Sequence, residues 1–316
     1  MVSERSFRIP ESGVRLDAAL LAAFPSSTRA FCRDAVANGM VTVNGRAARK
    51  GDKLRAGDEV HVKELLEADD NKVLPDRSVT LAELFADDAL LAYDKPAGMP
   101  VQPLTRSETG TLMNGVVAHH PEVASVGDQP LMAGALHRID AGTSGLVLVA
   151  RTQQAFDGMR AQFAGQSVEK TYLAMVEGAV AVGGTLEHDL AHTPGLPFCK
   201  IGEWRAMRVT EAERARLKPL HAVTRYRPIG RSMLQNQELT LLEVTIFTGV
   251  THQIRAQLAL AGMHIVNDRL YGAFAVEGEV GHRLHALSAK FRHPVSGDET
   301  VIRTQLPSWA VAVFQV

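Results

Sequence analysis

A chain of 316 residues exceeds what one compact core usually organises, and its 46% hydrophobic content is normal for globular proteins, so we expect two domains. Its 34 basic and 35 acidic side chains give a net charge of −1, which excludes a protein that coats nucleic acid indiscriminately but permits a local basic face. The sequence has no apolar run of membrane-spanning length and no apolar signal-peptide centre near its N-terminus, so we expect a cytoplasmic protein without membrane association.

The segment 14–62 is predicted to form a small α/β module. Ser26 or Ser27 can cap a helix with an apolar stripe, and Asn38-Gly39 supplies the left-handed residues that end it. The Asn44-Gly45 pair is the strongest two-residue hairpin signal. The strands expected around this turn are residues 40–43, a return strand from residue 46, and residues 59–62.

Basic side chains gather on this module. Arg29 and Arg33 are one helical turn apart and share a face, and further basic residues follow in the hairpin. Such a cluster is either an ordinary solvated face or a binding patch, and the compact helix and hairpin favour an RNA-binding patch. The expected RNA-binding residues are Arg29, Arg33, Arg46, Arg49, Lys50 and Lys53.

The polar, acidic stretch that follows this module has the composition of a linker. We therefore predict an RNA-binding domain over residues 1–66, a linker over 67–79 and a larger domain over 80–316. In the larger domain, residues 179–231 are expected to be irregular. The expected strands are 90–93, 146–150, 172–176 and 239–247, and a helix is expected over 252–261.

The most informative stretch runs from His137 to Gly145, directly before the apolar run 146–150. It places one aspartate, Asp140, on a glycine-bounded turn that leads into a buried strand. Loops held by such a scaffold are the usual location of reactive groups. Asp140 is therefore the leading candidate for a reactive group, and the alternative is that it only caps or bends the turn.

No metal site is expected. His188 and His192 have the spacing of a zinc-protease helix, but the glutamate that would act as base is absent and helix-breaking prolines follow soon after. Cys32 and Cys199 match neither a disulfide framework nor a zinc spacing.

Short segments at 94–101, 137–145, 169–174 and 248–255 occur in a characteristic order. Together they resemble the catalytic domain of RNA pseudouridine synthases of the ribosomal large subunit type, the family named for its member A. The N-terminal module, through Arg15-Leu16-Asp17 and residues 41–45, resembles the alpha-L RNA-binding domain. The resemblance implies an α+β fold in which this small domain precedes a mixed, mainly antiparallel β-sheet catalytic domain with flanking helices.

The same resemblance implies a role for each matching side chain. Asp140 would act at the anomeric carbon of a flipped uridine, either by forming a covalent bond or by assisting a glycal-type route. Arg255 would keep Asp140 ionised, and Tyr172 would stack on the uracil and relay a proton. Arg138 would fill the space left by the flipped base, and Ile254 would line the base pocket.

The sequence departs from the family pattern at a few positions. Val250 stands where the family has arginine, Gln102 stands where histidine is common, and Ile139 replaces leucine. None of these is a proposed chemical group, so we expect activity with altered substrate preference.

We therefore expect a monomeric isomerase, an RNA pseudouridine synthase that needs no cofactor or metal. Its first-choice substrate is large-subunit ribosomal RNA. The alternatives are a transfer RNA pseudouridine synthase and a non-catalytic RNA-binding factor for ribosome assembly.

Overall fold

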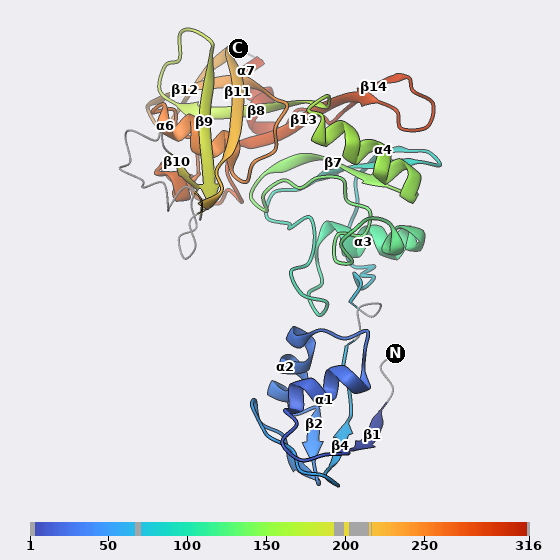
Figure 1. Ribbon diagram of the computed structural model, residues 1–316. Helices are drawn as coiled ribbons and strands as arrows, with labels where there is room; N and C mark the ends of the chain where they lie inside the picture. The colour runs from blue at the N-terminus through green and yellow to red at the C-terminus, as the bar shows by residue number, and fades with distance from the viewer. Residues whose placement is uncertain (1–3, 67–70, 193–198, 202–214, 216, 315–316) are drawn as a thin grey trace. The chain divides into compact units, whose positions relative to one another are not determined.

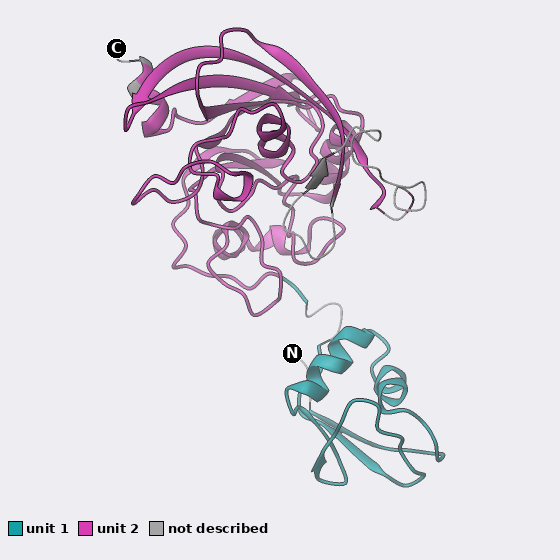
Figure 2. Ribbon diagram, turned by 90° about the vertical axis from the view of Figure 1, so that its left-hand side faces the viewer, with its two compact units in different colours: residues 1–72 teal, residues 73–316 magenta. Residues whose placement is uncertain are grey.

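The computed structural model describes residues 4–66, 71–192, 199–201, 215 and 217–314. Its contacts divide the chain into two compact units, Met1–Lys72 and Val73–Val316 (Figure 2). The division falls within the expected linker 67–79, of which residues 67–70 lie outside the described part. Residues from Val73 onward belong to the second unit, because Val73 is buried in that unit's core.

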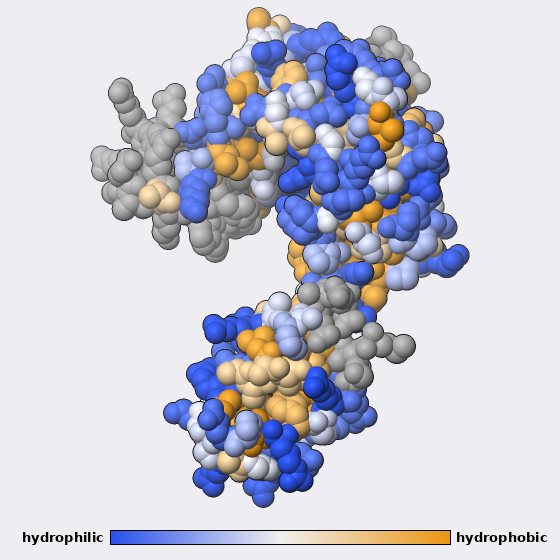
Figure 3. Space-filling model, turned by 45° about the vertical axis from the view of Figure 1, so that its right-hand side comes forward, coloured by the Kyte–Doolittle hydropathy of each residue, from blue (hydrophilic) through white to orange (hydrophobic). Residues whose placement is uncertain are grey.

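The first unit is a four-stranded sheet in the order β1-β4-β2-β3 with two helices. Side chains from both helices and from the strands share one core that includes Leu20, Cys32 and Val60. On the face drawn in Figure 3, hydrophobic residues gather near the middle of this unit with hydrophilic ones around them. The elements are β1 (Arg5–Arg8), α1 (Leu16–Ala23), α2 (Arg29–Ala37), β2 (Val41–Val43), β3 (Arg46–Ala47) and β4 (Glu59–Val62).

The predicted hairpin is confirmed, and the predicted helix cap is wrong. Asn44 and Gly45 have φ angles of 49° and 77°, the left-handed pair that a two-residue turn between β2 and β3 requires. The hydroxyl that caps α2 belongs to Thr28, which accepts a hydrogen bond from the Phe31 N–H at 3.2 Å. Ser27 instead donates its hydroxyl to the Leu66 carbonyl, at 2.8 Å, so it is not available as a cap.

The second unit is built on a ten-stranded sheet in the order β10-β9-β11-β12-β8-β13-β7-β6-β5, with β14 paired to β13 (Figure 1). Among the described strands, β13 and β7 form the one parallel pair, so the predicted mainly antiparallel sheet is confirmed. The strands are β5 (Glu83–Ala86), β6 (Leu90–Lys95), β7 (Ser144–Ala150), β8 (Glu169–Glu177), β9 (Gly184–His192), β10 (Cys199–Ile201), β11 (Leu220–Leu234), β12 (Gln237–Ile246), β13 (Leu284–Arg292) and β14 (Glu299–Arg303).

Successive residues of β8 point to opposite faces of the sheet, as strand geometry demands. Tyr172 and Ala174 belong to the larger core, whereas Leu173 and Met175 belong to a second core on the other face. Ile254 also lies in the larger core, so α6 and Tyr172 share one side of the sheet. The helices are α3 (Leu112–His119), α4 (Gln153–Ala164), α6 (Gln253–Leu260) and α7 (Ser308–Phe314), with short 3₁₀ helices η2 (Pro121–Ser125) and η3 (Arg269–Tyr271).

The strands predicted from apolar runs and the helix predicted at 252–261 are confirmed, but the irregular segment predicted at 179–231 is wrong. Strands β9, β10 and β11 lie within it, and residues 193–198, 202–214 and 216 lie outside the described part. Pro228 fits into β11 because the pairing register with β12 shifts between Pro228 and Gly230, and such bulges tolerate proline.

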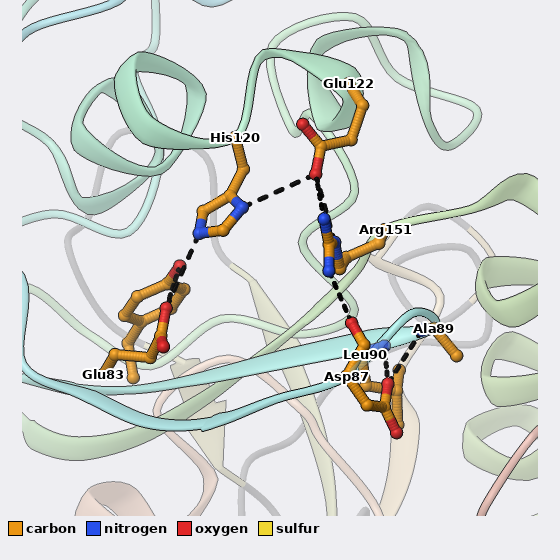
Figure 4. A network of polar contacts seen from close by, with 8 residues as sticks. Glu83, Asp87, Ala89, Leu90, His120, Glu122 and Arg151 are labelled. Carbon is orange, nitrogen blue, oxygen red and sulfur yellow. Dashed lines mark hydrogen bonds and ion pairs between the residues drawn. The ribbon is translucent and has the colours of Figure 1, made fainter.

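A polar network holds one edge of the sheet to the neighbouring helices (Figure 4). His120, at the end of α3, lies 3.5 Å from carboxylate oxygens of both Glu83 and Glu122. Arg151, just after β7, donates two hydrogen bonds to Glu122, at 3.0 and 2.8 Å, and one to the Asp87 carbonyl at 2.7 Å. The network ties the β5–β6 hairpin to α3, η2 and the end of β7.

Gly145 in β7 makes a clear stability prediction. Its φ is 110°, and an added Cβ would collide with the backbone of Ala286, its partner on β13. We expect Gly145→Ala to lower the free energy of unfolding by about 3 kcal/mol or more, from backbone strain plus overpacking. Gly178→Ala is the matched control, because Gly178 has a φ of 81° but no atom near its Cβ position, so strain alone should lower it by about 1 kcal/mol. Urea denaturation measures both, and equal losses would contradict the expected collision.

Candidate active site

A cavity of about 1050 Å³ opens in the second unit. It is lined by the turn before β7, by β8, and by α6 with the loop that precedes it. The structure places every residue predicted for catalysis or base binding along this one cavity. These residues are Asp140, Tyr172, Arg255, Arg138 and Ile254.

Asp140 lies on a tight turn whose closure does not need its side chain. The Thr143 N–H donates to the Asp140 backbone carbonyl at 3.0 Å, and the Gly98 N–H donates to the next carbonyl, that of Ala141, at 2.7 Å. The Asp140 side chain is 27% exposed and its carboxylate contacts Arg255. The backbone therefore supports the turn, and the carboxylate is turned towards the cavity and its cation.

Lys95 braces this turn from inside the protein. Its ammonium group donates to the carbonyl oxygens of Pro96 at 2.9 Å, Met99 at 2.7 Å and Ala141 at 3.3 Å. Burial lowers the pKa of Lys95 to about 8, although the negative charge of Asp140 opposes that shift. The bonds join the turn after β6 to the residue that follows Asp140, so Lys95 fixes the backbone that carries the carboxylate.

Arg255 on α6 connects two carboxylates. Its Nη1 donates to Asp140 Oδ2 at 2.7 Å, while its Nε and Nη2 donate to the two oxygens of Asp268 at 2.7 and 2.8 Å. Its guanidinium also lies 5.2 Å from the ring centroid of Tyr271. Burial opposes the charge, but the bonds and charges of Asp268 and Asp140 outweigh it and raise the pKa of Arg255. Arg255 is therefore a permanent buried cation beside Asp140.

His252 begins α6 in a left-handed conformation, with a φ of 57°. Its Nε2 lies 3.8 Å from Asp140 Oδ1, and its Nδ1 lies 3.1 Å from the Tyr271 hydroxyl. Sequence reasoning assigned no role to His252, Asp268 or Tyr271. The signal that could have pointed to an acidic partner such as Asp268 is the chemistry of Arg255 itself. A buried guanidinium has several N–H donors and a positive charge, so it favours more than one acceptor.

Tyr172 lies in the middle of the sheet with 7% of its surface exposed. It pairs with Val244 on β12 and with Ala286 on β13. Burial, and then the negative charge of Asp140, raise the pKa of Tyr172. The hydroxyl is therefore protonated at neutral pH and can donate a hydrogen bond within the cavity.

The loop before α6 is shaped by Gln253. Its side-chain oxygen accepts from the Thr248 hydroxyl at 2.8 Å and from the Val250 N–H at 3.2 Å. Its side-chain nitrogen donates to the Val223 carbonyl and the Thr224 hydroxyl on β11, at 3.0 and 3.1 Å. Val250 takes part through its backbone, so its side chain is not needed to hold this loop.

The histidine pair considered for zinc lies on a strand, β9, rather than on a helix. His188 Nδ1 lies 3.2 Å from the side-chain nitrogen of Gln257, and the side chain of His192 lies outside the described part. Across the described residues, no group of three or more His, Cys, Asp or Glu side chains could hold a metal ion.

The basic residues predicted to bind RNA lie on the first unit and are all exposed. Arg29 and Arg33 are on α2, and Arg46 is on β3, directly after the hairpin turn. None of the described helices is both long enough and apolar enough to cross a membrane.

Two family models match this chain. The model described as RNA pseudouridylate synthase matches residues 89–260, and the S4 domain model matches residues 14–60. The first match spans the turn of Asp140, β8 and α6, and the second spans the α/β module with the basic residues.

Similar curated proteins include a ribosomal large subunit pseudouridine synthase D from Xanthomonas campestris pv. campestris. It is 34% identical over 96% of this chain and 89% of its own length. A protein of the same name from Pseudomonas aeruginosa is 30% identical over 92% of this chain and 79% of its own length. Among solved structures, human RNA pseudouridylate synthase domain containing 1 has a TM-score of 0.58 at 19% identity and covers 74% of this chain and 86% of its own, a likeness in fold.

Proposed function

The chain belongs to the RNA pseudouridylate synthase family, and we propose that it converts uridines of large-subunit ribosomal RNA to pseudouridine. The observation that carries the proposal is the partly exposed carboxylate of Asp140, bonded to the buried Arg255 in the cavity that Tyr172 also lines. Ribosomal RNA is the first-choice substrate because both of the curated relatives described above carry ribosomal large subunit names.

The isomerisation breaks the bond between uracil N1 and the ribose anomeric carbon, turns the detached base and joins its C5 to the same carbon. N1 gains a proton and C5 loses one, so no atoms enter or leave overall. An ionised carboxylate suits this reaction because it can attack or stabilise an electron-poor anomeric centre. We assign that role to Asp140, with the covalent and glycal-type routes both open to it.

The other lining residues receive roles that match their positions. Tyr172 stacks on the uracil, which is worth about 1–3 kcal/mol for a base on an aromatic ring, and its hydroxyl relays a proton. Ile254, 4% exposed, lines the base pocket. The exposed Arg138 enters the RNA and occupies the space of the extruded base, whose extrusion costs a few kcal/mol.

Pseudouridine maps of total RNA from cells with and without the gene test the proposal. We expect modified positions in large-subunit ribosomal RNA to disappear with the gene and to return with the wild-type chain, but not with Asp140→Asn. Positions lost from transfer RNA instead would establish the alternative substrate. Unchanged maps with defective ribosome assembly would establish a non-catalytic factor.

We propose that the first unit binds RNA through its basic residues. Neutralising Arg29, Arg33 and Lys50 to glutamine should weaken RNA binding and reduce the slope of log K against log salt by about one for each phosphate that is no longer neutralised. The control neutralises Lys290, Arg292 and Arg303, which are also exposed but lie on β13 and β14. Binding titrations at several salt concentrations measure both slopes, and equal changes would show that the first unit holds no dedicated patch.

We also predict that the enzyme is monomeric and cytoplasmic and that it needs no cofactor or metal. Light scattering of the purified chain measures the oligomeric state. Activity after dialysis against a chelator, compared with activity before it, measures any need for metal.

A further inference from the structure

We infer that Asp268 is a positioning residue for the proposed reaction. This inference rests on the proposed function, in which Asp140 is the reacting carboxylate. By accepting hydrogen bonds from Nε and Nη2, Asp268 fixes the guanidinium of Arg255 in a position from which Nη1 makes one hydrogen bond to Asp140, on Oδ2. The second carboxylate oxygen of Asp140 is thereby left for the sugar.

Arg255 makes a stronger contact with Asp268 than with Asp140. Its two parallel bonds, of 2.7 and 2.8 Å, match the planar fork of the guanidinium to both oxygens of one carboxylate. The side chain of Asp268 is 2% exposed and that of Arg255 is 8% exposed, so water competes little for these bonds. Such a pair fixes the plane of the guanidinium as well as its position.

The orientation of the guanidinium plane determines which N–H groups of Arg255 can reach the carboxylate of Asp140. With Nε and Nη2 engaged, Nη1 reaches Asp140 Oδ2 at 2.7 Å, while Asp140 Oδ1 lies 3.8 Å from His252 Nε2. Without Asp268, the guanidinium could turn and present a full fork to Asp140. Both carboxylate oxygens would then be tied by charge-assisted bonds, and neither would be free to approach the anomeric carbon.

Asp268 is itself held in place by its backbone. Its N–H donates to the Ile265 carbonyl at 2.9 Å, and its carbonyl accepts from the Tyr271 and Ala273 N–H groups at 3.1 and 3.2 Å. The same turn places the Tyr271 ring against Arg255 and its hydroxyl against His252. The segment after α6 therefore supports both side chains that approach Asp140 from that helix.

Other titratable groups also face Asp140, and they bear on any pH measurement. Lys95 comes from β6 and Tyr172 from β8, and the charge of Asp140 acts on both. His282, which bonds to Thr143 in the Asp140 turn, has its pKa lowered to about 4 by burial and by the charge of Arg255. Among the residues that the structure describes, the groups considered are Lys95, Tyr172, His252, Arg255, Asp268 and His282.

The test compares Asp268→Asn with the wild type on the RNA that the wild type modifies. We expect kcat to fall about 100-fold, as misplacement of a reacting group does, with KM changed by less than about threefold. A change in kcat with little change in KM would separate misplacement of the reacting carboxylate from a loss of RNA binding.

Glu122→Gln is the matched control, because Glu122 also accepts two hydrogen bonds from an arginine but lies in the network of Figure 4. It should keep the wild-type kcat and pH profile. If Asp268→Asn does not fold, Asp268→Glu replaces it, since it keeps the charge and shifts the carboxylate by one methylene. Its kcat should also fall.

Two results would overturn the inference. One is a wild-type kcat in folded Asp268→Asn or Asp268→Glu. The other is a loss in Asp268→Asn that appears in KM alone, which would indicate general distortion. Failure of the proposed function is a different result, because it appears as an inactive wild-type chain.

If the wild-type chain is inactive, the arrangement around Arg255 can still be tested by a measurement of stability. Melting temperatures of Asp140→Asn, Asp268→Asn and the double variant show whether the two carboxylates share Arg255. The double variant should lose more than the sum of the single losses, since only there is the buried cation left without an acid. Additive losses would overturn the shared arrangement.

Discussion

Asp140→Asn should abolish pseudouridine formation, lowering kcat/KM by at least about 10⁴-fold, the loss that follows replacement of even a non-reacting catalytic aspartate in serine proteases. The amide keeps the shape of the side chain but carries no negative charge for the anomeric carbon. The fold should survive, because Arg255 keeps its two bonds to Asp268 and so remains compensated. We expect the free energy of unfolding to fall by about 1 kcal/mol, the worth of one partly exposed bond.

Mass spectrometry of a modified RNA fragment measures the product, and urea denaturation measures stability. Asp128→Asn is a matched control, because Asp128 also lines the cavity but has no assigned role. It should stay within about twofold of the wild-type rate, as surface substitutions commonly do. Unchanged product formation by Asp140→Asn would remove the basis for the proposed mechanism.

Much of the sheet could be predicted because its central strands are continuous apolar runs. Residues 146–150 are buried on both faces of the sheet, so their apolar character is uninterrupted. Strand β11 was missed because it lies towards the edge and mixes buried and exposed positions. Only Ala222 and Thr224 are buried in its first half, which also carries the polar His221, Arg225 and Arg227 and is followed by Pro228. Local composition there resembles a loop, and only pairing with β9 and β12 makes it a strand.

The candidate site divides in the same way. Asp140, Tyr172 and Arg255 stand in short segments with a recognisable order, so the sequence sufficed to select them. Asp268 has no such marker. It lies 13 residues beyond Arg255, and the contact depends on the turn that follows α6 rather than on any periodic spacing. Partners of a buried charge are set by tertiary structure, which a pattern along the chain does not contain.

Arg255→Met should cost both activity and stability. It leaves Asp140 and the 2% exposed Asp268 facing one another without their cation. Breaking a buried ion pair by removing one partner lowers the free energy of unfolding by about 3–5 kcal/mol. Activity should fall by at least about 10³-fold, since the carboxylate proposed to react loses the hydrogen bond from Arg255 that positions it.

Urea denaturation of Arg255→Met and of the wild type measures the stability loss, and mass spectrometry of the modified RNA fragment measures the loss of activity.

Arg151→Met supplies the comparison that separates this effect from the loss of any arginine. Arg151 also bonds a carboxylate twice, but its side chain is 28% exposed and that of Glu122 is 42% exposed. Solvent compensates the carboxylate left behind, so the loss should be about 1 kcal/mol or less. Similar losses in the two variants would mean that Asp140 and Asp268 do not depend on a shared buried cation, and the proposed ionisation of Asp140 by Arg255 would lose its physical basis.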